Sequence, residues 1–317
     1  MRQISYAQAG SEALAEELRR DPKTLVLSTD AAPALVEEFG DQRIRATPIA
    51  EGAVTGMAIG AAGCGYRPIV NWRIVTFSFV AMDQIVNQAS KIHYMFGGQA
   101  KFPLVFRATV GGGGKLAAQH SQSPYSMFMN LAGLKIILPS TPYDMKGLMK
   151  SAIRDDNPVI SFESSRLMGF KGDVPEKEYT LPIGKADVKR EGSDITIVAI
   201  AWLVHEALAA AETLAKEGVS VEVVDPRSLF PLDAETIRTS VRKTGRLLIA
   251  DEAGPTAGAS AEIAALAAED ANTFACLKAP IKRVCALQVP IPYSPVLEDH
   301  VFPDRDKIAA GVRAVLR

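Results

Sequence analysis

Short apolar runs that alternate with longer amphipathic stretches constrain this sequence more than any other feature. Runs such as Thr24–Ser28 and Pro68–Trp72 are rich in β-branched and aromatic residues, whereas residues 6–20 place Ala13, Leu14 and Leu18 at helical spacing. Strands that alternate with helices form a mostly parallel sheet with helices on both faces. The sequence therefore predicts an α/β fold.

The same alternation starts a second time at Asp194. Between the two series, residues 165–193 are rich in glycine, proline and charge and show no strong hydrophobic period, so we interpret them as a linker. A chain of 317 residues is long enough for two domains. We expect two doubly wound domains, residues 1–180 and residues 181–317.

Composition and charge exclude several classes of function. A net charge of -1 gives no basic field for nucleic acid or anionic lipid. No apolar run reaches the roughly 18–20 residues that span a bilayer, and the first residues lack the apolar core of a signal peptide. Cys64, Cys276 and Cys285 form no C-x-x-C pair, so we expect three buried, reduced thiols in a cytoplasmic protein.

Glu51 is the first candidate for a chemical role. It begins a helix rich in small residues between Gly52 and Ala62, and the dipole at the start of a helix favours a negative charge. A carboxylate that only caps the helix explains that position. The small residues behind Glu51 argue for more, because they lower helix propensity and are tolerated where another backbone or a ligand comes close. An extended entry through Thr47 and Pro48 fixes the approach to this helix.

A strand, a helix and a histidine loop follow. We expect an aromatic strand through Trp72–Phe79 and one helix from about Phe79 to Tyr94. His120 ends a polar loop (108–121) that contains four consecutive glycines and follows the end of a strand, where open α/β sheets place ligands. The glycines do not fit a phosphate loop, because that pattern requires glycine at Thr109 and serine or threonine at Leu116.

Eight separate blocks of this sequence resemble the β subunit of the thiamine-dependent first component of 2-oxo acid dehydrogenase complexes. The family includes the pyruvate, branched-chain 2-oxo acid and acetoin dehydrogenases. The blocks are Thr47–Glu51, Met82–Gln88, Tyr94–Gln99, Ala117–Gln122, Leu138–Lys146, Ala152–Pro158, Leu181–Ala186 and Tyr293–Asp299. The resemblance implies a pyrimidine-binding domain followed by a transketolase-type C-terminal domain.

The resemblance also implies roles for individual residues. Glu51 matches the glutamate that hydrogen-bonds a pyrimidine nitrogen of thiamine diphosphate, and Ile49 matches a residue that packs near that ring. Phe77 matches the aromatic residue that stacks on the ring, although a two-residue shift would put Phe79 there. His120 matches the histidine that assists proton transfer and acyl transfer to a lipoyl group. The cofactor carries the carbanion chemistry.

One motif is missing. Thiamine enzymes hold magnesium and diphosphate with a Gly-Asp-Gly motif and a later asparagine, and this sequence contains no Gly-Asp-Gly. In the family that motif lies on an α subunit, so we expect an α2β2 heterotetramer in which the α subunit holds the magnesium. A lipoyl acyltransferase is a further expected partner. Leu104, Ala152, Asp155 and Asn157 match a structural potassium site built largely from carbonyl oxygens.

Departures from the family pattern leave the substrate open. The segment near 28–45 is about ten residues short, Asn71 replaces a common acidic residue, and Arg73 adds a charge that favours an anionic substrate. The stretch Asp251–Pro255 favours the acetoin branch. Two alternatives stay open: a split transketolase-like enzyme that moves two-carbon units between sugars, and a non-catalytic β scaffold.

Overall fold

The computed structural model describes residues 2–317, which divide into two compact units. The first unit contains the chain up to Val110, Met127–Glu163 and Leu167–Ile183. The second unit contains Gly111–Ser126, Ser164–Arg166 and Gly184–Arg317. The glycine-rich segment before His120 therefore belongs by its contacts to the second unit. The domains expected at residues 1–180 and 181–317 stay a prediction.

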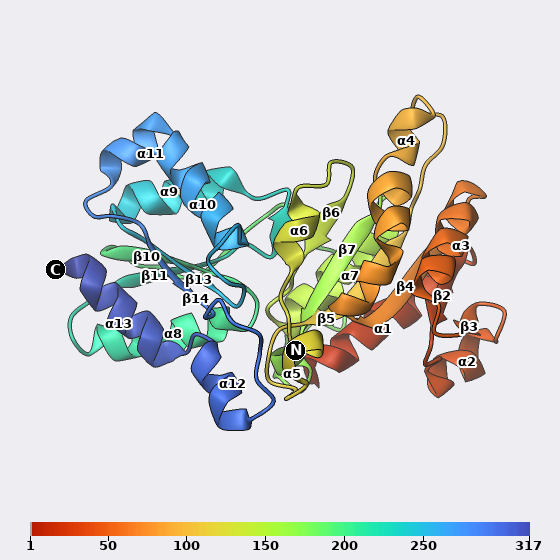
Figure 1. Cartoon of the computed structure of the whole chain (residues 1–317), viewed down its shortest axis with the longest axis horizontal. Helices are drawn as coiled ribbons and strands as arrows, with labels where there is room; N and C mark the ends of the chain where they lie inside the picture. The colour runs from red at the N-terminus through yellow and green to blue at the C-terminus, as the bar shows by residue number, and fades with distance from the viewer. Residues whose placement is uncertain (1) are drawn as a thin grey trace. The chain divides into compact units, whose positions relative to one another are not determined.

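The first unit is built on a parallel sheet (Figure 1). Its strands, in spatial order, are β6 (Lys135–Ile137), β7 (Val159–Ser164), β5 (Val105–Val110), β4 (Arg67–Ile74), β2 (Thr24–Ser28) and β3 (Ile44–Ala46). Its helices include α1 (Tyr6–Arg20), α2 (Pro33–Phe39), α3 (Glu51–Gly63) and α7 (Pro142–Arg154). Helix α1 packs against α7, and the buried amines of Lys146 and Lys150 both pair with Glu16 there.

The second unit has a five-stranded sheet with helices on both faces (Figure 1). Its strand order is β14 (Lys282–Cys285), β13 (Leu247–Asp251), β10 (Ile195–Ala199), β11 (Val221–Asp225) and β9 (Asp187–Arg190). Helices α9 (Ala234–Thr244) and α10 (Ala259–Glu269) cover one face, and α8 (Leu203–Ala215) and α13 (Arg305–Leu316) cover the other. Both units confirm the predicted α/β fold.

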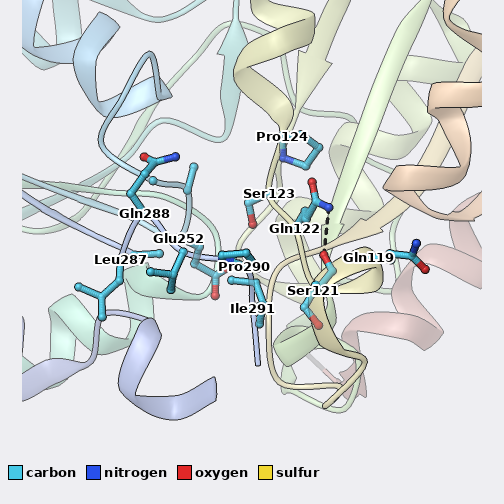
Figure 2. A pocket seen from close by; sticks show the side chains of 15 residues that line it. Gln119, Ser121, Gln122, Ser123, Pro124, Glu252, Leu287, Gln288, Pro290 and Ile291 are labelled. Atoms are coloured by element: carbon cyan, nitrogen blue, oxygen red, sulfur yellow. Dashed lines mark hydrogen bonds between the residues drawn. The ribbon is translucent and has the colours of Figure 1, made fainter. Parts of the chain in front are cut away.

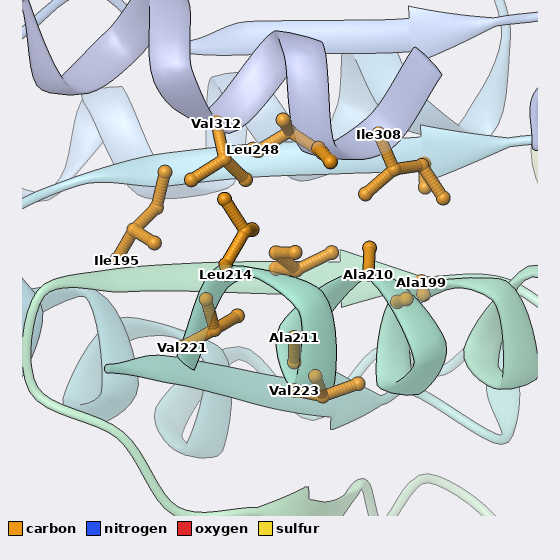
Figure 3. Packing of buried hydrophobic residues seen from close by; sticks show 14 of the residues in the cluster. Ile195, Ala199, Ala210, Ala211, Leu214, Val221, Val223, Leu248, Ile308 and Val312 are labelled. Carbon is orange, nitrogen blue, oxygen red and sulfur yellow. The ribbon is translucent and has the colours of Figure 1, made fainter. Parts of the chain in front are cut away.

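The core beneath α8 and α13 explains this arrangement (Figure 3). Ile195 and Val221 on the strands, Leu214 on α8 and Val312 on α13 are all fully buried. Strands that are apolar at nearly every position must be covered on both faces, which a parallel sheet between two helical layers achieves.

The predicted aromatic strand is wrong beyond Ile74. A register shift between Asn71 and Ile74 ends the regular pairing of β4, with Arg73 at a φ of 66°. A 3₁₀ helix (Val75–Ala81) follows. Its buried residues, Val75, Ser78 and Ala81, recur every third position, which is the period of a 3₁₀ helix.

Other elements differ from the predictions. The single helix expected from Phe79 to Tyr94 is a π-helical segment (Gln84–Ala89) followed by the short α4 (Ile92–Met95). The expected linker contains two strands, because β8 (Lys171–Val174) pairs with β1 (Arg2–Ser5) and β9 pairs with β11. Both strands are partly exposed, which explains their weak hydrophobic pattern.

The expectation of three buried cysteines is also wrong. Cys64 is exposed, and Cys276 and Cys285 are half-buried; all three are free thiols. Between residues 2 and 317, no helix combines the length and the apolar character that a membrane span requires.

Candidate active site

Glu51 lies at the start of α3, as predicted. Its side chain is half-buried, and Ala50 before it offers no side-chain cap to the helix. Within residues 2–317, the Glu51 carboxylate makes no hydrogen bond or ion pair with another residue. A carboxylate that only served the fold would be expected to cap or pair. This one is available to a ligand.

The glycines of α3 have a packing role. A Cβ on Gly52 would lie 3.3 Å from the carbonyl oxygen of Val80, and one on Gly56 would lie 3.7 Å from Cγ of Gln84. The 3₁₀ and π-helical segments therefore approach α3 closely on this face. The small residues that drew attention to Glu51 are explained by a neighbouring backbone.

Ile49 and the two candidate aromatic residues lie near this helix in the sequence and on the same unit. Ile49 is 84% exposed, which is high for an isoleucine. Phe77 and Phe79 both lie on the 3₁₀ helix and are half-buried. Because each residue of a 3₁₀ helix turns by about 120°, the side chains of Phe77 and Phe79 point in different directions.

Arg73 has a partner within the protein. Its guanidinium forms an ion pair with Asp30, and both side chains are more than half exposed. Its backbone is held by the Asn71 side chain, which accepts from the Arg73 N–H at 2.9 Å, and by the Thr109 hydroxyl, which donates to the Arg73 carbonyl at 2.7 Å. The charge predicted to attract an anionic substrate is therefore shared with a carboxylate.

His120 belongs to the second unit and ends a one-turn helix, α5 (Ala117–His120). Its side chain is half-buried. The segment around it closes on itself: the Gly111 N–H donates to the Gln122 carbonyl at 3.0 Å, and the Gln122 amide donates to the Ala118 carbonyl at 3.0 Å. The expected loop is thus a compact turn with a defined shape.

A cavity of about 480 Å³ lies beside this segment (Figure 2). It is lined by Ala118–Pro124 without His120, by Glu252–Gly254 and by Ala286–Ile291. The hydroxyls of Ser121 and Ser123 are buried there and have no hydrogen-bond partner among the described residues. A hollow with a largely apolar lining and two unpartnered hydroxyls suits a small ligand that carries polar groups, or ordered water.

Glu252 is a functional candidate that the sequence did not identify. It lines the cavity and is 3% exposed. Burial raises the pKa of its carboxyl to about 7, while the nearby Arg166 lowers this pKa and Asp251 raises it. A perturbed carboxyl in a hollow is a common mark of a functional site. No motif signals it, because Arg166 and Glu252 meet only in the folded chain.

The four residues matched to a potassium site all lie in the first unit. The Leu104 carbonyl accepts from the Val159 N–H at 3.0 Å, and the Ala152 carbonyl accepts from the Asp155 N–H at 3.3 Å. Asn157 donates its N–H to the Asp155 carboxylate at 2.9 Å. These contacts link Ala152, Asp155 and Asn157 to one another, whereas the bond of Leu104 is to Val159.

Two cationic side chains of the protein already bind oxygen atoms of Asp155. Lys135 pairs with the Asp155 carboxylate, and Arg67 donates to the Asp155 carbonyl at 3.0 Å. No group of three or more histidine, cysteine or acidic side chains in the described chain could hold a metal ion. A potassium ion here would be bound by carbonyl oxygens.

The candidate residues are thus divided between the units. Ile49, Glu51 and Phe77 lie in the first unit, as do the potassium candidates, and His120 lies in the second together with the cavity and Glu252.

Two family models together cover almost the whole chain. Residues 2–170 match the transketolase pyrimidine-binding domain, and residues 184–308 match the transketolase C-terminal domain. A split-gene transketolase, solved as an inactive β4 tetramer, superimposes with a TM-score of 0.82 at 25% identity, over 99% of this chain and 98% of that one. A transketolase mutant from Pichia stipitis shares the fold, with a TM-score of 0.68 at 16% identity over 46% of its length.

Curated relatives are similar over their full lengths. The β subunit of acetoin:2,6-dichlorophenolindophenol oxidoreductase from Cupriavidus necator is 44% identical, covering 100% of this chain and 98% of the relative. The 2-oxoisovalerate dehydrogenase β subunit of Bacillus subtilis is 43% identical, with 98% of both chains covered. The pyruvate dehydrogenase E1 β subunit of Rickettsia felis is 42% identical, over 99% and 98%.

Proposed function

The chain belongs to the transketolase-like family of acetoin and 2-oxo acid dehydrogenase β subunits, and we propose that it is such a subunit. It acts with an α subunit and thiamine diphosphate in the oxidative cleavage of acetoin or a 2-oxo acid, with acyl transfer to lipoamide. The observation that carries this proposal is Glu51, a half-buried carboxylate without a partner at the start of a helix.

The residues present fit the reacting end of the cofactor. When bound, thiamine diphosphate supplies the carbanion chemistry. Glu51 would hold a proton at a ring nitrogen of the aminopyrimidine, which needs a carboxyl free of other partners. Ile49 and Phe77 would fix the ring by packing. His120 would move a proton at the substrate and guide the acyl group to the lipoyl thiol.

Phe77 and Phe79 can be separated by substitution. We propose that Phe77 stacks on the pyrimidine. Phe77→Leu in the assembled enzyme should weaken cofactor binding by about fivefold, because aromatic stacking contributes roughly 1 kcal/mol beyond area burial. Phe79→Leu is the matched control on the same 3₁₀ helix. The opposite order of effects would assign the stacking role to Phe79.

The absence of Gly-Asp-Gly supports a shared cofactor site. We propose an α2β2 assembly in which the α subunit holds magnesium and diphosphate. Large apolar side chains on the first unit support an extensive interface: Tyr94, Met95 and Phe96 are 85%, 72% and 54% exposed. A lipoyl acyltransferase would bind to this assembly. The three free thiols support a location in the reducing cytoplasm.

Potassium would have a structural role. The carbonyl oxygens of Leu104, Ala152 and Asp155 each keep a second lone pair beyond the hydrogen bond they accept. A weakly hydrated cation can use those lone pairs. Replacing potassium with tetramethylammonium should then lower the melting temperature of the isolated chain. An unchanged melting temperature would mean that Arg67 and Lys135 suffice.

Calorimetry tests the main proposal. The chain is purified alone and with a co-expressed α chain that carries Gly-Asp-Gly and the later asparagine. Thiamine diphosphate with magnesium should bind only to the pair, and the pair should oxidise acetoin, pyruvate or 2-oxoisovalerate with dichlorophenolindophenol as acceptor. A folded pair that binds no cofactor contradicts the proposal.

The split-transketolase alternative is favoured by one observation, the fold match to a split-gene transketolase. Turnover of sugar phosphates by the pair, without turnover of acetoin or 2-oxo acids, would establish it. A non-catalytic scaffold would show neither activity. A neighbouring gene that encodes a Gly-Asp-Gly chain argues against the scaffold.

A further inference from the structure

The segment Gly111–Leu116, here called the glycine loop, lies against a cluster of charges in the second unit. The Gly113 N–H donates to the carboxylate of Glu298, which is fully buried. Lys115 donates to Asp299 at 2.7 Å and lies 3.8 Å from the second oxygen of Glu298. The loop is therefore tied by its backbone and by its only cation.

Packing explains why the loop consists of glycines. A Cβ on Gly111 would lie 2.5 Å from Oε2 of Glu252, and one on Gly113 would lie 2.5 Å from Cγ of Arg166. A Cβ on Gly112 would overlap the ring of Phe302. Glu252, Arg166 and Phe302 thus press directly on the loop backbone. The glycines serve this contact, and no phosphate is needed to explain them.

Arg166 joins these groups. Its Nε lies 3.9 Å from Oε1 of Glu252, its Nη2 lies 3.7 Å from Asp299, and its guanidinium stacks over the Phe302 ring at 5.4 Å. Oε1 of Glu252 and Nε of Arg166 are both buried and form no hydrogen bond within the described chain. The attraction between Glu252 and Arg166, which Arg166 shares with Asp299, offsets part of the cost of burying the Glu252 carboxylate.

The end of the segment is fixed as well. The Tyr125 hydroxyl donates to the buried carboxylate of Asp251, the neighbour of Glu252. His120 lies between this anchor and the glycine loop, on a helix of one turn that has no side-chain cap. A helix this short has little stability of its own, so its position depends on the anchors at either side.

We propose that Glu252 and Arg166 are positioning residues, which as an ion pair hold the glycine loop and thereby set the place of His120. This inference rests on the proposed catalytic role of His120. Neither residue lies within the matched motifs that suggested Glu51 and His120, and neither is assigned a contact with substrate.

The pair is sensitive to pH because Glu252 must be ionised to attract Arg166. Burial raises the pKa of Glu252 to about 7, with Arg166 opposing and Asp251 reinforcing this shift. The other charged or titratable groups around the pair are Tyr125, Lys115, Glu298 and Asp299. Below pH 7 the Glu252 carboxyl becomes neutral and no longer attracts Arg166, so the glycine loop is held less firmly.

Hydrogen exchange tests the hold on the loop without any need for activity. Peptides covering residues 111–124 are followed by mass spectrometry in the co-expressed complex, at one pH near 8. Glu252→Gln and Arg166→Gln should each exchange there about tenfold faster than wild type, as expected when one charge-assisted contact is lost. Peptides from β10 and α8 should not change.

Kinetics test the consequence for His120. The ratio of wild-type kcat to Glu252→Gln kcat should be near one at pH 6 and rise to about tenfold at pH 8.5, because the wild-type carboxyl is neutral at the lower pH. Ionisations that both enzymes share cancel in this ratio. KM should change less than about twofold, since neither residue is expected to bind substrate.

Glu217→Gln is the matched control, because it breaks an exposed ion pair with Arg313 in the same unit. It should leave loop exchange and the kinetic ratio unchanged.

If Arg166→Gln does not fold, the inference is tested with Arg166→Lys and Glu252→Gln. Unchanged loop exchange in Glu252→Gln, or a ratio that does not depend on pH, overturns the inference. A complex that lacks all activity but shows the faster exchange contradicts the proposed function and leaves the loop anchoring established.

Discussion

A Cβ on Gly111 would lie 2.5 Å from a carboxylate oxygen of Glu252. Gly111 also has a φ of 81°, a conformation that other residues rarely adopt. Gly111→Ala therefore combines backbone strain with a clash against a buried carboxylate. We expect the isolated chain to lose roughly 2–4 kcal/mol of unfolding free energy in urea titration.

Gly60→Ala is the control for that substitution. Gly60 lies within α3, and a Cβ there would meet nothing within 4 Å. Alanine should raise the stability of the isolated chain by up to about 1 kcal/mol through helix propensity. Equal effects of the two substitutions would contradict the packing argument for the glycine loop.

The pKa of Glu252 predicts an unusual dependence of stability on pH. Burial raises this pKa to about 7 from an ordinary value of 4.5, so the folded chain binds a proton that the unfolded chain releases. The contribution of Glu252 is complete below pH 4.5 and is lost as pH rises through 7. At pH 8, Glu252→Gln should be more stable than wild type by about 3 kcal/mol, because the pKa is raised by about 2.5 and a change of one in pKa corresponds to about 1.4 kcal/mol.

Urea unfolding of both proteins at pH 5 and pH 8 measures this effect. The stability gap between them should be small at pH 5 and several-fold larger at pH 8. If Glu252→Gln has a higher unfolding free energy than wild type and yet its glycine loop exchanges faster, Glu252 positions the loop and does not stabilise the fold as a whole. A gap of the same size at both pH values would contradict the assigned pKa.

Glu51→Gln should leave folding intact and remove most turnover. The carboxylate forms no hydrogen bond or ion pair with another described residue, so its loss costs only about 0.5 kcal/mol from the helix dipole. The amide cannot hold the proton at the aminopyrimidine, and kcat of the complex should fall by about 100-fold or more. Steady-state rates with acetoin and pyruvate measure this. Activity like that of wild type would refute the role of Glu51.

His120→Ala should affect the two half-reactions unequally. Transfer of the acyl group to lipoamide should slow more than the first cleavage step, because that transfer requires a proton to move at the thiol. Stopped-flow measurement with dichlorophenolindophenol reports the first step, and lipoamide acylation reports the second. Equal loss in both steps would give His120 a role only in positioning.

A buried ion pair in the first unit gives a prediction of stability alone. Arg107 donates to both oxygens of Glu163, at 2.7 and 3.0 Å, and the two side chains are 16% and 7% exposed. Glu163→Gln leaves the guanidinium buried with a weaker partner and should cost about 3 kcal/mol of unfolding free energy. Urea titration of the isolated chain measures this cost. The double variant Glu163→Gln/Arg107→Met should recover part of the lost unfolding free energy, because it removes the buried guanidinium. If nothing is recovered, the unpaired guanidinium is not the cause of the lost stability.

Much of the fold follows from local pattern. The strands Thr24–Ser28 and Ile195–Ala199 follow from short apolar runs, and the helix Tyr6–Arg20 follows from its hydrophobic period. The helix Pro33–Phe39 buries no residue, and it is indicated by the proline at its start and by Gly40 at its end. Glu51 at a helix start is a local feature of the same kind, and the sequence identified it. Elements whose form depends on distant packing, such as the 3₁₀ helix at Val75–Ala81, were misassigned.

The sequence by itself determined the α/β class, the family blocks, the candidates Glu51 and His120, and the missing diphosphate motif. The tertiary structure decided which unit holds the glycine loop and which residues press on it. Glu252, Arg166 and Phe302 are far from Gly111 in the sequence, and no local period records a contact made by chain folding. For the same physical reason, a pKa near 7 at Glu252 cannot be read from its neighbours, because it arises from burial among groups that only the fold brings together.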